Sequence, residues 1–322
     1  MRYLSLFSGI GGFEDAIYQV FGQKATCVGY SEIDKHAIKE YERHYPDHQN
    51  LGDINLLKKK DIDKLGKIDL VVGGFPCNDL SSANFNKRRG LDGIKSGLFW
   101  KMLDILKWVK RNNSHFQIII ENNASMAHKW RDVITEELRK TLKRDVFYNF
   151  IDSSQFVLQR RKRYFWTFVL LPEYSGSRLK SQTFNHVLDP LKKINMKELL
   201  VPSFIIKTKN KPYGDGNQGI IWNEEKNEFV KSSYSTRWKS SLSLIENGYI
   251  KCVTTVRNDN ILLDTRPNNA ILRYLSKEEL NKLFGFSKNN YVDSNVSSIY
   301  FRLYGMSVVP LVIVYILSHL DL

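Results

Sequence analysis

The sequence contains little cysteine and no long apolar run. Its three cysteines, Cys27, Cys77 and Cys252, lie far apart and form no CxxC pair. Disulfide frameworks and zinc sites need closely spaced sets, so neither is expected, and the sparse cysteines indicate a reducing compartment. No apolar run reaches the roughly 18 residues that cross a bilayer, and residues 308–320 are predicted to form a terminal core helix. We therefore expect no membrane segment, and no signal peptide, because residues 1–6 run directly into a strand pattern.

Acidic residues are in deficit. The chain of 322 residues has 48 Lys and Arg against 34 Asp and Glu, a formal net charge of +14 at pH 7. Such an excess favours a polyanionic partner, most often nucleic acid, although a lysine-rich genome would produce the same charge. The length suits one large domain with a smaller one.

The N-terminal part has the pattern of a cofactor-binding α/β fold. Residues 3–7 are strand-like, Ser8-Gly9-Ile10-Gly11-Gly12 form a glycine-rich turn, and residues 13–21 have helical spacing. Backbone N–H groups of such a turn can hold a nucleotide-like ligand, although a tight turn alone would look the same. A second strand over 26–30 leads to Glu32, where a carboxylate commonly holds a ribose diol; a helix cap is the alternative reading. We predict a doubly wound, mostly parallel α/β sheet.

Cys77 stands at the predicted carboxyl end of a buried strand. Residues 68–72 are apolar and β-branched, and Gly73-Gly74-Phe75-Pro76 lead from them to the cysteine. Open α/β sheets bind their ligands at this edge. A lone cysteine is more often a buried structural residue, so the neighbouring motifs must decide between the two readings.

Two further strand-like runs have charged residues at one end. Residues 116–120 lead to Glu121, which is either a helix cap or a catalytic acid. A basic cluster precedes the apolar residues 164–169, and within it Gln159, Arg161 and Arg163 are predicted to share one side of a single strand.

The organisation changes after about residue 172. Residues 174–272 hold short β-like runs among Asn, Gly, Lys and Ser, which predicts a small irregular β-rich domain that reads a nucleic-acid groove; a structural lid is the alternative. We predict a larger α/β domain over 1–173, this smaller domain over 174–272, and a segment over 273–322 that completes the first. A helical pattern returns at Arg273, and Ser276 and Glu279 are spaced to form a capping box.

Together these motifs resemble the DNA (cytosine-5)-methyltransferase family, in its bacterial or phage restriction-modification form. Matches follow the family order from residue 3 to about 320 and agree at six sites. The resemblance implies a Rossmann-like S-adenosylmethionine-dependent methyltransferase domain and places target recognition in residues 174–272. The sequence departs from the family at Asn123, where valine is usual, and at Met306, where asparagine is usual.

The resemblance also implies a role for each matched residue. Cys77 is expected to attack C6 of cytosine, with Glu121 at N3, Arg163 at O2 and Arg161 in support. Cofactor contacts are expected from Phe7, Ser8, Gly9, Ile10, Gly11, Gly12, Glu32, Ile33, Asp53, Ile54, Phe75, Leu98, Met306 and Ser307. Substrate contacts are expected from Pro76, Ser81, Asn122, Gln159, Arg237 and Arg257.

The predicted reaction transfers a methyl group from S-adenosylmethionine to C5 of a flipped-out cytosine in a short sequence of double-stranded DNA. S-adenosylhomocysteine is the expected product, and no metal is required. The alternatives are a tRNA cytosine-5 methyltransferase and a catalytically silent, methyltransferase-like DNA-binding protein with Met306 as its lesion. We expect a monomer in the bacterial cytoplasm, at the nucleoid, or in a phage-infected cell. A cognate restriction endonuclease would act independently.

Overall fold

The computed structural model describes residues 1–76, 91, 93, 97–174, 252–255, 273–289 and 291–322 in full. It also describes the backbone of the strands at 219–223, 228–232, 242–244, 250–251, 261–264 and 271–272. Four residues predicted from the sequence to act at the site, Cys77, Ser81, Arg237 and Arg257, lie outside these described residues.

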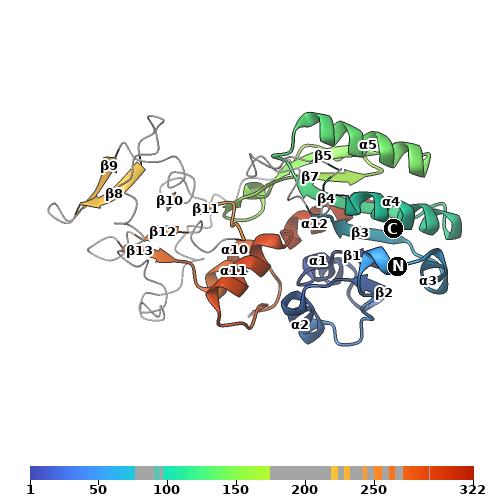
Figure 1. Ribbon diagram of the computed structural model, residues 1–322, viewed down its shortest axis with the longest axis horizontal. Coiled ribbons are helices and arrows are strands. Elements are labelled where there is room, and N and C mark those ends of the chain that lie inside the picture. The colour runs from blue at the N-terminus through green and yellow to red at the C-terminus, as the bar shows by residue number, and fades with distance from the viewer. Residues whose placement is uncertain are drawn as a thin grey trace.

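A six-stranded sheet lies in the right-hand half of Figure 1, in the strand order β2-β1-β3-β4-β7-β5. The strands are β1 (Arg2–Leu6), β2 (Thr26–Ser31), β3 (Leu70–Gly74), β4 (Gln117–Asn123), β5 (Phe147–Asp152) and β7 (Lys162–Thr167). The first four are parallel, and β7 is antiparallel to both β4 and β5. The carboxyl ends of β1 to β4 and the amino end of β7 therefore meet at one edge.

Helices cover both faces of this sheet (Figure 1). They are α1 (Gly12–Phe21), α2 (Lys35–His44), α3 (Lys59–Lys64), α4 (Leu98–Asn112), α5 (His128–Leu142), α10 (Lys277–Phe284), α11 (Ser297–Met306) and α12 (Pro310–Leu317), with short 3₁₀ turns η1 (Gly22–Lys24), η2 (Ile54–Leu56) and η4 (Ser153–Gln155). One apolar core includes α1 and α10 to α12, and the other includes α3, α4 and α5. The predicted doubly wound α/β class is confirmed.

Strand β4 shows why the sequence forms such a sheet. Ile118, Ile119 and Ile120 are all fully buried, as a strand covered on both faces requires. Ile118 and Ile120 belong to one core, whereas Ile119 belongs to the other, because successive side chains of a strand point to opposite faces.

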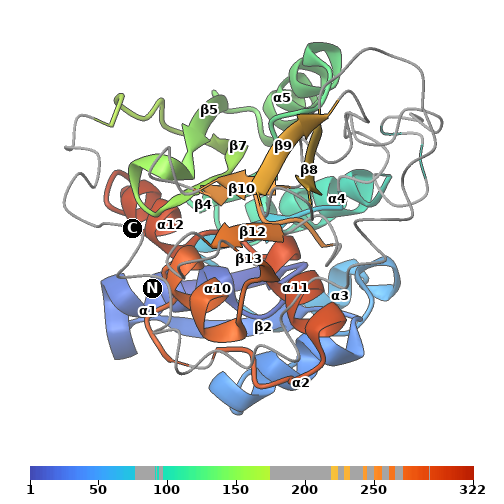
Figure 2. The ribbon, with the colours of Figure 1, turned by 90° about the vertical axis from the view of Figure 1, so that its left-hand side faces the viewer.

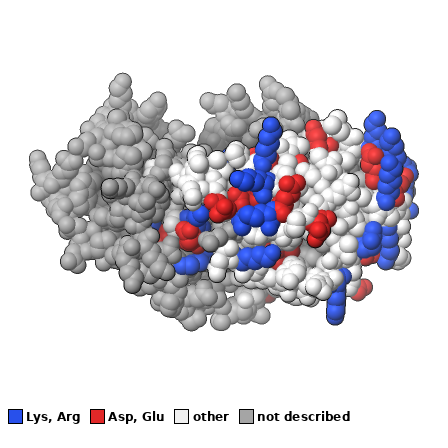
Figure 3. Space-filling model, turned by 90° about the horizontal axis from the view of Figure 1, so that it is seen from below, with Lys and Arg blue, Asp and Glu red and all other residues white. Residues whose placement is uncertain are grey.

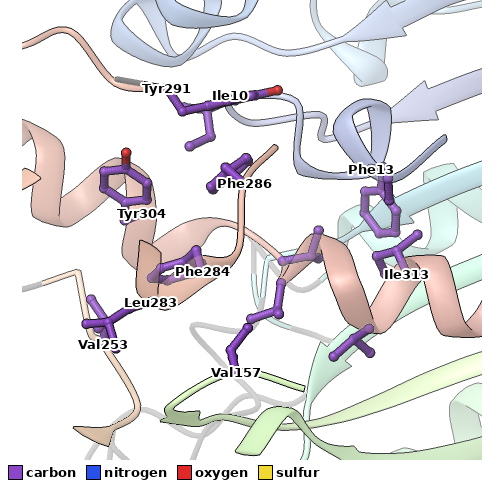
Figure 4. Packing of buried hydrophobic residues seen from close by; sticks show 14 of the residues in the cluster. Ile10, Phe13, Val157, Val253, Leu283, Phe284, Phe286, Tyr291, Tyr304 and Ile313 are labelled. Carbon is purple, nitrogen blue, oxygen red and sulfur yellow. The ribbon is translucent and has the colours of Figure 1, made fainter. Parts of the chain in front are cut away.

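The C-terminal helices share the core of the N-terminal strands. Phe13 of α1 packs in the same cluster as Ile313 of α12, and Figure 4 shows the two side chains next to each other. The described strands after residue 174 are β8 (Gly219–Asn223), β9 (Glu228–Ser232), β10 (Leu242–Leu244), β11 (Ile250–Lys251), β12 (Ile261–Asp264) and β13 (Ile271–Tyr274). Figure 2 shows several of them in front of the sheet when the molecule is seen from that end. The domain boundaries stay predictions, and β13 crosses the second of them.

Gln159, Arg161 and Arg163 do not lie on the one continuous strand that the sequence suggests. β6 (Gln159–Arg160) pairs with β11, whereas β7 begins only at Lys162, so the chain changes partners at Arg161. The Arg161 N–H donates to Ser153 Oγ at 3.0 Å, and the Ser153 N–H donates to the Arg161 carbonyl at 3.1 Å. These bonds take Arg161 out of the ladder, so the prediction of one continuous strand is wrong.

The helix after β13 begins as its cap predicts. The Ser276 hydroxyl accepts from the Glu279 N–H at 3.1 Å, and the Glu279 carboxylate accepts from the Ser276 N–H at 2.9 Å. The predicted capping box is thus confirmed. Arg273 belongs to β13 and not to the helical pattern in which the sequence placed it.

The segment Ser297–Leu317 is long and apolar enough to cross a membrane, contrary to the expectation that no run reaches this length. Its most apolar window is 67% buried inside the protein, as in a core helix. α11 ends at Met306 and α12 begins at Pro310, a residue suited to the first turn of a helix.

Candidate active site

Four strand ends bring the predicted cofactor and catalytic segments to one edge of the sheet. In the register of the sheet, Leu6 lies opposite both Ser31 and Gly73, and Gly74 lies opposite Glu121. The turn after β1, the acid after β2, the segment after β3 and the acid in β4 are therefore neighbours. This edge is where open α/β sheets bind their ligands.

Glu121 and Arg163 form an ion pair at this edge. Arg163 Nε lies 2.7 Å from Glu121 Oε1, and each side chain is 13% exposed. Arg163 on β7 lies directly opposite Asn123 on β4. Glu121 is two residues before Asn123 and points to the same face of the sheet, so its carboxylate is within reach of the Arg163 side chain. The pair borders a pocket that is also lined by Ile151, Ser153, Arg161, Phe165, Val308, Val309 and Val312.

The segment that leads to Cys77 is held against the same pair. A Cβ atom on Gly74 would lie 2.8 Å from Glu121 Oε2, so only glycine lets β3 approach the carboxylate this closely. The Asn122 amide donates to the Phe75 carbonyl at 2.8 Å. Asn122 is 1% exposed, and its amide therefore fixes the last described turn before Cys77.

Glu32 is oriented by backbone groups. Its Oε2 accepts from the Gly9 N–H at 2.9 Å, and its Oε1 accepts from the N–H groups of Ile33 and Asp34 at 2.8 and 2.9 Å. The carboxylate joins the glycine turn to the end of β2. A carboxylate fixed in this way can also accept a hydrogen bond from a hydroxyl group of a ligand, because Oε2 accepts only one of these backbone bonds and keeps a second lone pair.

The surroundings of Glu32 fit a nucleoside. Among the described residues, a Cβ atom on Gly9 or Gly52 would meet nothing within 4 Å, so this part of the structure leaves space beside both backbones. Ile33 is 65% exposed, which leaves an apolar surface next to the carboxylate. The buried Ser8 hydroxyl has no hydrogen-bond partner among the described residues. A ribose and an aromatic base would complement these groups.

The turn after β1 is tightly constrained. Phe7 has a φ of 55°, and Gly11, the N-cap of α1, has a φ of 90°. A Cβ atom on Gly12 would lie 2.8 Å from Ser307 Oγ and 2.9 Å from Val308 Cγ2, so the turn packs directly on the segment after α11. The structure thus brings together the glycine turn and the segment around Ser307, both of which the sequence analysis assigned to cofactor binding.

The other predicted cofactor residues have different surroundings. Asp53 caps η2 by accepting from the Asn55 N–H at 2.9 Å, and Ile54 is buried. Leu98 is the first residue of α4. Met306 is 47% exposed at the end of α11.

The chain matches the family of C-5 cytosine-specific DNA methylases over residues 1–321. It belongs to this family. Orphan methyltransferase M.Rho11sI of Bacillus phage rho11s is 45% identical over 109 residues, 33% of this chain and 20% of that protein. Type II methyltransferase M.HgiCII of Herpetosiphon aurantiacus is 32% identical over 206 residues, 59% of this chain and 43% of that protein. The alignments thus span less than half the length of these curated relatives.

Solved structures with similar coordinates show the same fold. The Entamoeba histolytica methyltransferase EhMeth has a TM-score of 0.70 at 17% identity and covers 99% of this chain and 97% of its own. The Dnmt2 methyltransferase of S. pombe has a TM-score of 0.69 at 18% identity, with the same coverage. At these identities the likeness shows the fold alone.

Arg161 and Gln159 hold distant segments of the chain together. The Arg161 guanidinium, 4% exposed, donates to the Gly305 carbonyl at 2.9 Å and to the Val253 carbonyl at 3.2 Å. The Gln159 amide, fully buried, donates to the Leu283 carbonyl at 3.4 Å and accepts from the Val253 N–H at 3.3 Å. Both side chains tie the β6–β7 junction to residues 252–255 and to the C-terminal helices.

Cys252 also lies next to the site, although the sequence analysis gave it no role. Its Sγ lies 3.4 Å from the Arg161 guanidinium. Burial opposes ionisation of the thiol, but the guanidinium groups of Arg161 and Arg163 outweigh it and lower the pKa of Cys252. Burial instead raises the pKa of Cys27 to about 12. No local pattern marks Cys252, because the pairing of β6 with β11 brings it to the site.

The surface charge of the protein is mixed on the face shown in Figure 3. Lys and Arg side chains there stand among Asp and Glu side chains. Over the described part of this face, the basic excess of the sequence is not gathered into one uninterrupted patch.

Proposed function

We propose that this protein methylates C5 of a flipped-out cytosine in a short, specific sequence of double-stranded DNA. The observation that carries the proposal is the ion pair of Glu121 with Arg163 beside β3, whose continuation leads to Cys77. Membership of the C-5 cytosine-specific DNA methylase family supports cytosine as the target. Because C5 and C6 are inaccessible inside a duplex, the base must leave the stack to reach this edge.

Cytosine C5 is a weak nucleophile, and the proposed role of Cys77 is to activate it. Addition of the Cys77 thiolate at C6 forms an S–C6 bond and makes C5 an enamine-like carbon. S-adenosylmethionine, when bound, would supply an electrophilic methyl group: C5 would form its new bond to the methyl carbon as the sulfonium–methyl bond breaks, which leaves S-adenosylhomocysteine. Loss of the C5 proton to water would then return an electron pair to the ring and expel the Cys77 sulfur.

Glu121 and Arg163 would stabilise the charge that this addition places on the ring. In the proposed arrangement Glu121 hydrogen-bonds N3, and Arg163 holds O2 while it remains paired with Glu121. Asn122 would act through Phe75, by fixing the turn before Cys77. Arg161 would act through the carbonyls of Gly305 and Val253.

The groups around Glu32 would hold the methyl donor. Glu32 is placed to accept from the ribose hydroxyls, and the exposed Ile33 to cover one face of the adenine. The Ser8 hydroxyl, which has no partner among the described residues, would offer a polar group, and the space beside Gly9 in the same part of the chain would leave room for the remainder of the donor.

We propose that the protein acts as a monomer, in the bacterial cytoplasm, at the nucleoid or in a phage-infected cell. The similarity to a methyltransferase of a Bacillus phage supports this setting. Any cognate restriction endonuclease would bind DNA separately, because the proposed reaction needs only this chain, its DNA and the methyl donor.

The test is methylation of unmethylated plasmid DNA with labelled S-adenosylmethionine, followed by bisulfite sequencing. The proposal predicts methylcytosine in one repeated short motif, and its complete loss in Cys77→Ala. DNA that contains 5-fluorocytosine should trap a covalent adduct with the wild-type protein and none with Cys77→Ala.

Cys27→Ala is the matched control, because its thiol is held protonated by burial and lies in β2. It should retain both methylation and trapping. Label in tRNA and none in DNA would favour the RNA enzyme. DNA binding without label or adduct would favour a catalytically silent protein, and either result would overturn the proposal.

A further inference from the structure

The turn proposed to bind the methyl donor rests on a tyrosine from the C-terminal segment. Tyr291 is fully buried, and its hydroxyl donates to the Gly11 carbonyl at 2.9 Å. The same hydroxyl lies 2.9 Å from the hydroxyl of Tyr45. Figure 4 shows Tyr291 beside Ile10 of the turn. Residues 280 positions apart in the sequence therefore meet at the start of α1.

Tyr291 is itself fixed on every side. Its ring stacks between His44 and Phe286, with centroid distances of 4.0 Å to each. Its N–H donates to Asn281 Oδ1 at 3.2 Å, and its carbonyl accepts from the Arg43 guanidinium at 2.7 Å. The hydroxyl therefore reaches Gly11 from a rigid base, so little further ordering is needed to hold the turn.

Gly11 is the residue at which the turn becomes helix α1. A Cβ atom there would lie 2.8 Å from Tyr45 Cε2 and 3.1 Å from the Tyr291 hydroxyl oxygen. The Gly11 carbonyl also accepts from the Asp15 N–H at 2.9 Å, the first bond of the helix. The first N–H groups of a helix have no partner within the helix, and a ligand can bind to them. By holding the Gly11 carbonyl, Tyr291 fixes the direction in which these N–H groups of α1 point.

We propose that Tyr291 is a positioning residue for the methyl donor, which it serves by holding the Gly9–Gly12 turn in the binding conformation. This inference rests on the proposed function. A turn that is ordered in advance binds its ligand without an ordering cost. Loss of the hydroxyl should weaken binding of the donor and leave the chemistry at Glu121 and Arg163, on other strands, unchanged.

The test is Tyr291→Phe, which removes only the hydroxyl. The Kd for S-adenosylhomocysteine, measured by calorimetry, and the KM for S-adenosylmethionine should each rise about 5-fold, as expected for one net hydrogen bond. The kcat and the KM for DNA should stay within about 2-fold. Tyr45→Phe should raise the Kd by less, and the double variant should resemble Tyr291→Phe alone, because both act through one network.

Tyr300→Phe is the matched control. Tyr300 is also buried, with 4% of its surface exposed, and its hydroxyl donates at 3.3 Å to the Leu275 carbonyl and not to a residue of the Gly9–Gly12 turn. It should leave the Kd and the KM for the donor unchanged. An unchanged Kd in Tyr291→Phe, or a parallel loss of kcat, DNA affinity and Tm, would overturn the inference. If the wild-type protein does not bind S-adenosylhomocysteine, the proposed function fails together with this inference. If the wild-type protein binds it and Tyr291→Phe has the same Kd, only the inference about Tyr291 is rejected.

Discussion

Arg163 Nε lies 2.7 Å from Glu121 Oε1, across two neighbouring antiparallel strands. Both side chains are 13% exposed, so solvent screens their attraction less than it would on an open surface. An ion pair between groups on two strands of one sheet restricts the direction of both side chains. The pair is therefore oriented before any substrate arrives, which makes it the first target for mutation.

Arg163→Lys should lower kcat by about 100-fold, because lysine keeps the charge and loses the planar fork that can hold two partners at once. Single-turnover methylation with labelled donor measures the effect. Arg139→Lys is the matched control. Arg139 lies on α5, outside the proposed site, and its Nε donates to the Val146 carbonyl at 3.0 Å. A kcat within 2-fold of wild type in Arg163→Lys would remove this residue from the proposed chemistry.

Glu32→Gln should raise the KM for S-adenosylmethionine about 10-fold with kcat preserved. The amide nitrogen of glutamine cannot accept a hydrogen bond, so one of the backbone contacts from Gly9 or from Ile33 and Asp34 is lost. Glu42→Gln, at an exposed position of α2, should change neither constant. Loss of kcat with an unchanged KM would contradict a role of Glu32 in donor binding.

The parts of the fold that were predictable from the sequence are those with strong local signals. Three consecutive isoleucines in β4 predict a strand buried on both faces, and the Ser276–Glu279 spacing predicts the start of α10. Each of these patterns is complete within a few residues of chain. The motif order added the candidate site, through resemblance to a family and not through local physics.

The parts that the sequence did not reveal depend on contacts between distant segments. Arg161 interrupts its strand because Ser153 and the Gly305 carbonyl bind it, and neither partner is part of a local pattern. Cys252 reaches the site through the pairing of β11 with β6. Tyr291 lies 280 residues from Gly11. Contacts between residues so far apart leave no periodic pattern in the sequence, so they become visible only in the folded structure.

Glu279→Gln should lower the free energy of unfolding by about 3–5 kcal/mol. Glu279 not only closes the capping box but also binds Arg273 through both oxygens at 2.8 Å, and both side chains are fully buried. The substitution keeps the shape and leaves the Arg273 charge buried without its counter-ion. Urea unfolding, followed by circular dichroism, measures the loss.

Ser276→Ala separates the cap from the ion pair at the same helix. It removes only the hydroxyl that accepts from the Glu279 N–H, and it should cost about 1 kcal/mol. Equal losses in Ser276→Ala and Glu279→Gln would show that the ion pair with Arg273 adds nothing to the cap.

The stability of the protein should depend on pH through Glu14, a buried residue in the first turn of α1. Glu14 is 1% exposed, and burial raises its pKa from 4.5 to about 7. The hydroxyls of Ser5 and Tyr41 favour the carboxylate and oppose this shift, whereas the charge of Asp15 adds to it. The folded chain therefore keeps a proton between pH 4.5 and 7 that the unfolded chain releases.

The sign of the pH effect follows from that proton. The stabilising contribution of neutral Glu14 is complete below the unfolded pKa and is lost as pH rises through about 7, by about 3 kcal/mol in total. Glu14→Gln stays neutral, so its stability relative to wild type should increase between pH 5 and pH 8. Urea midpoints of both proteins at four pH values test this, because a difference that is constant with pH would mean that Glu14 does not titrate in this range.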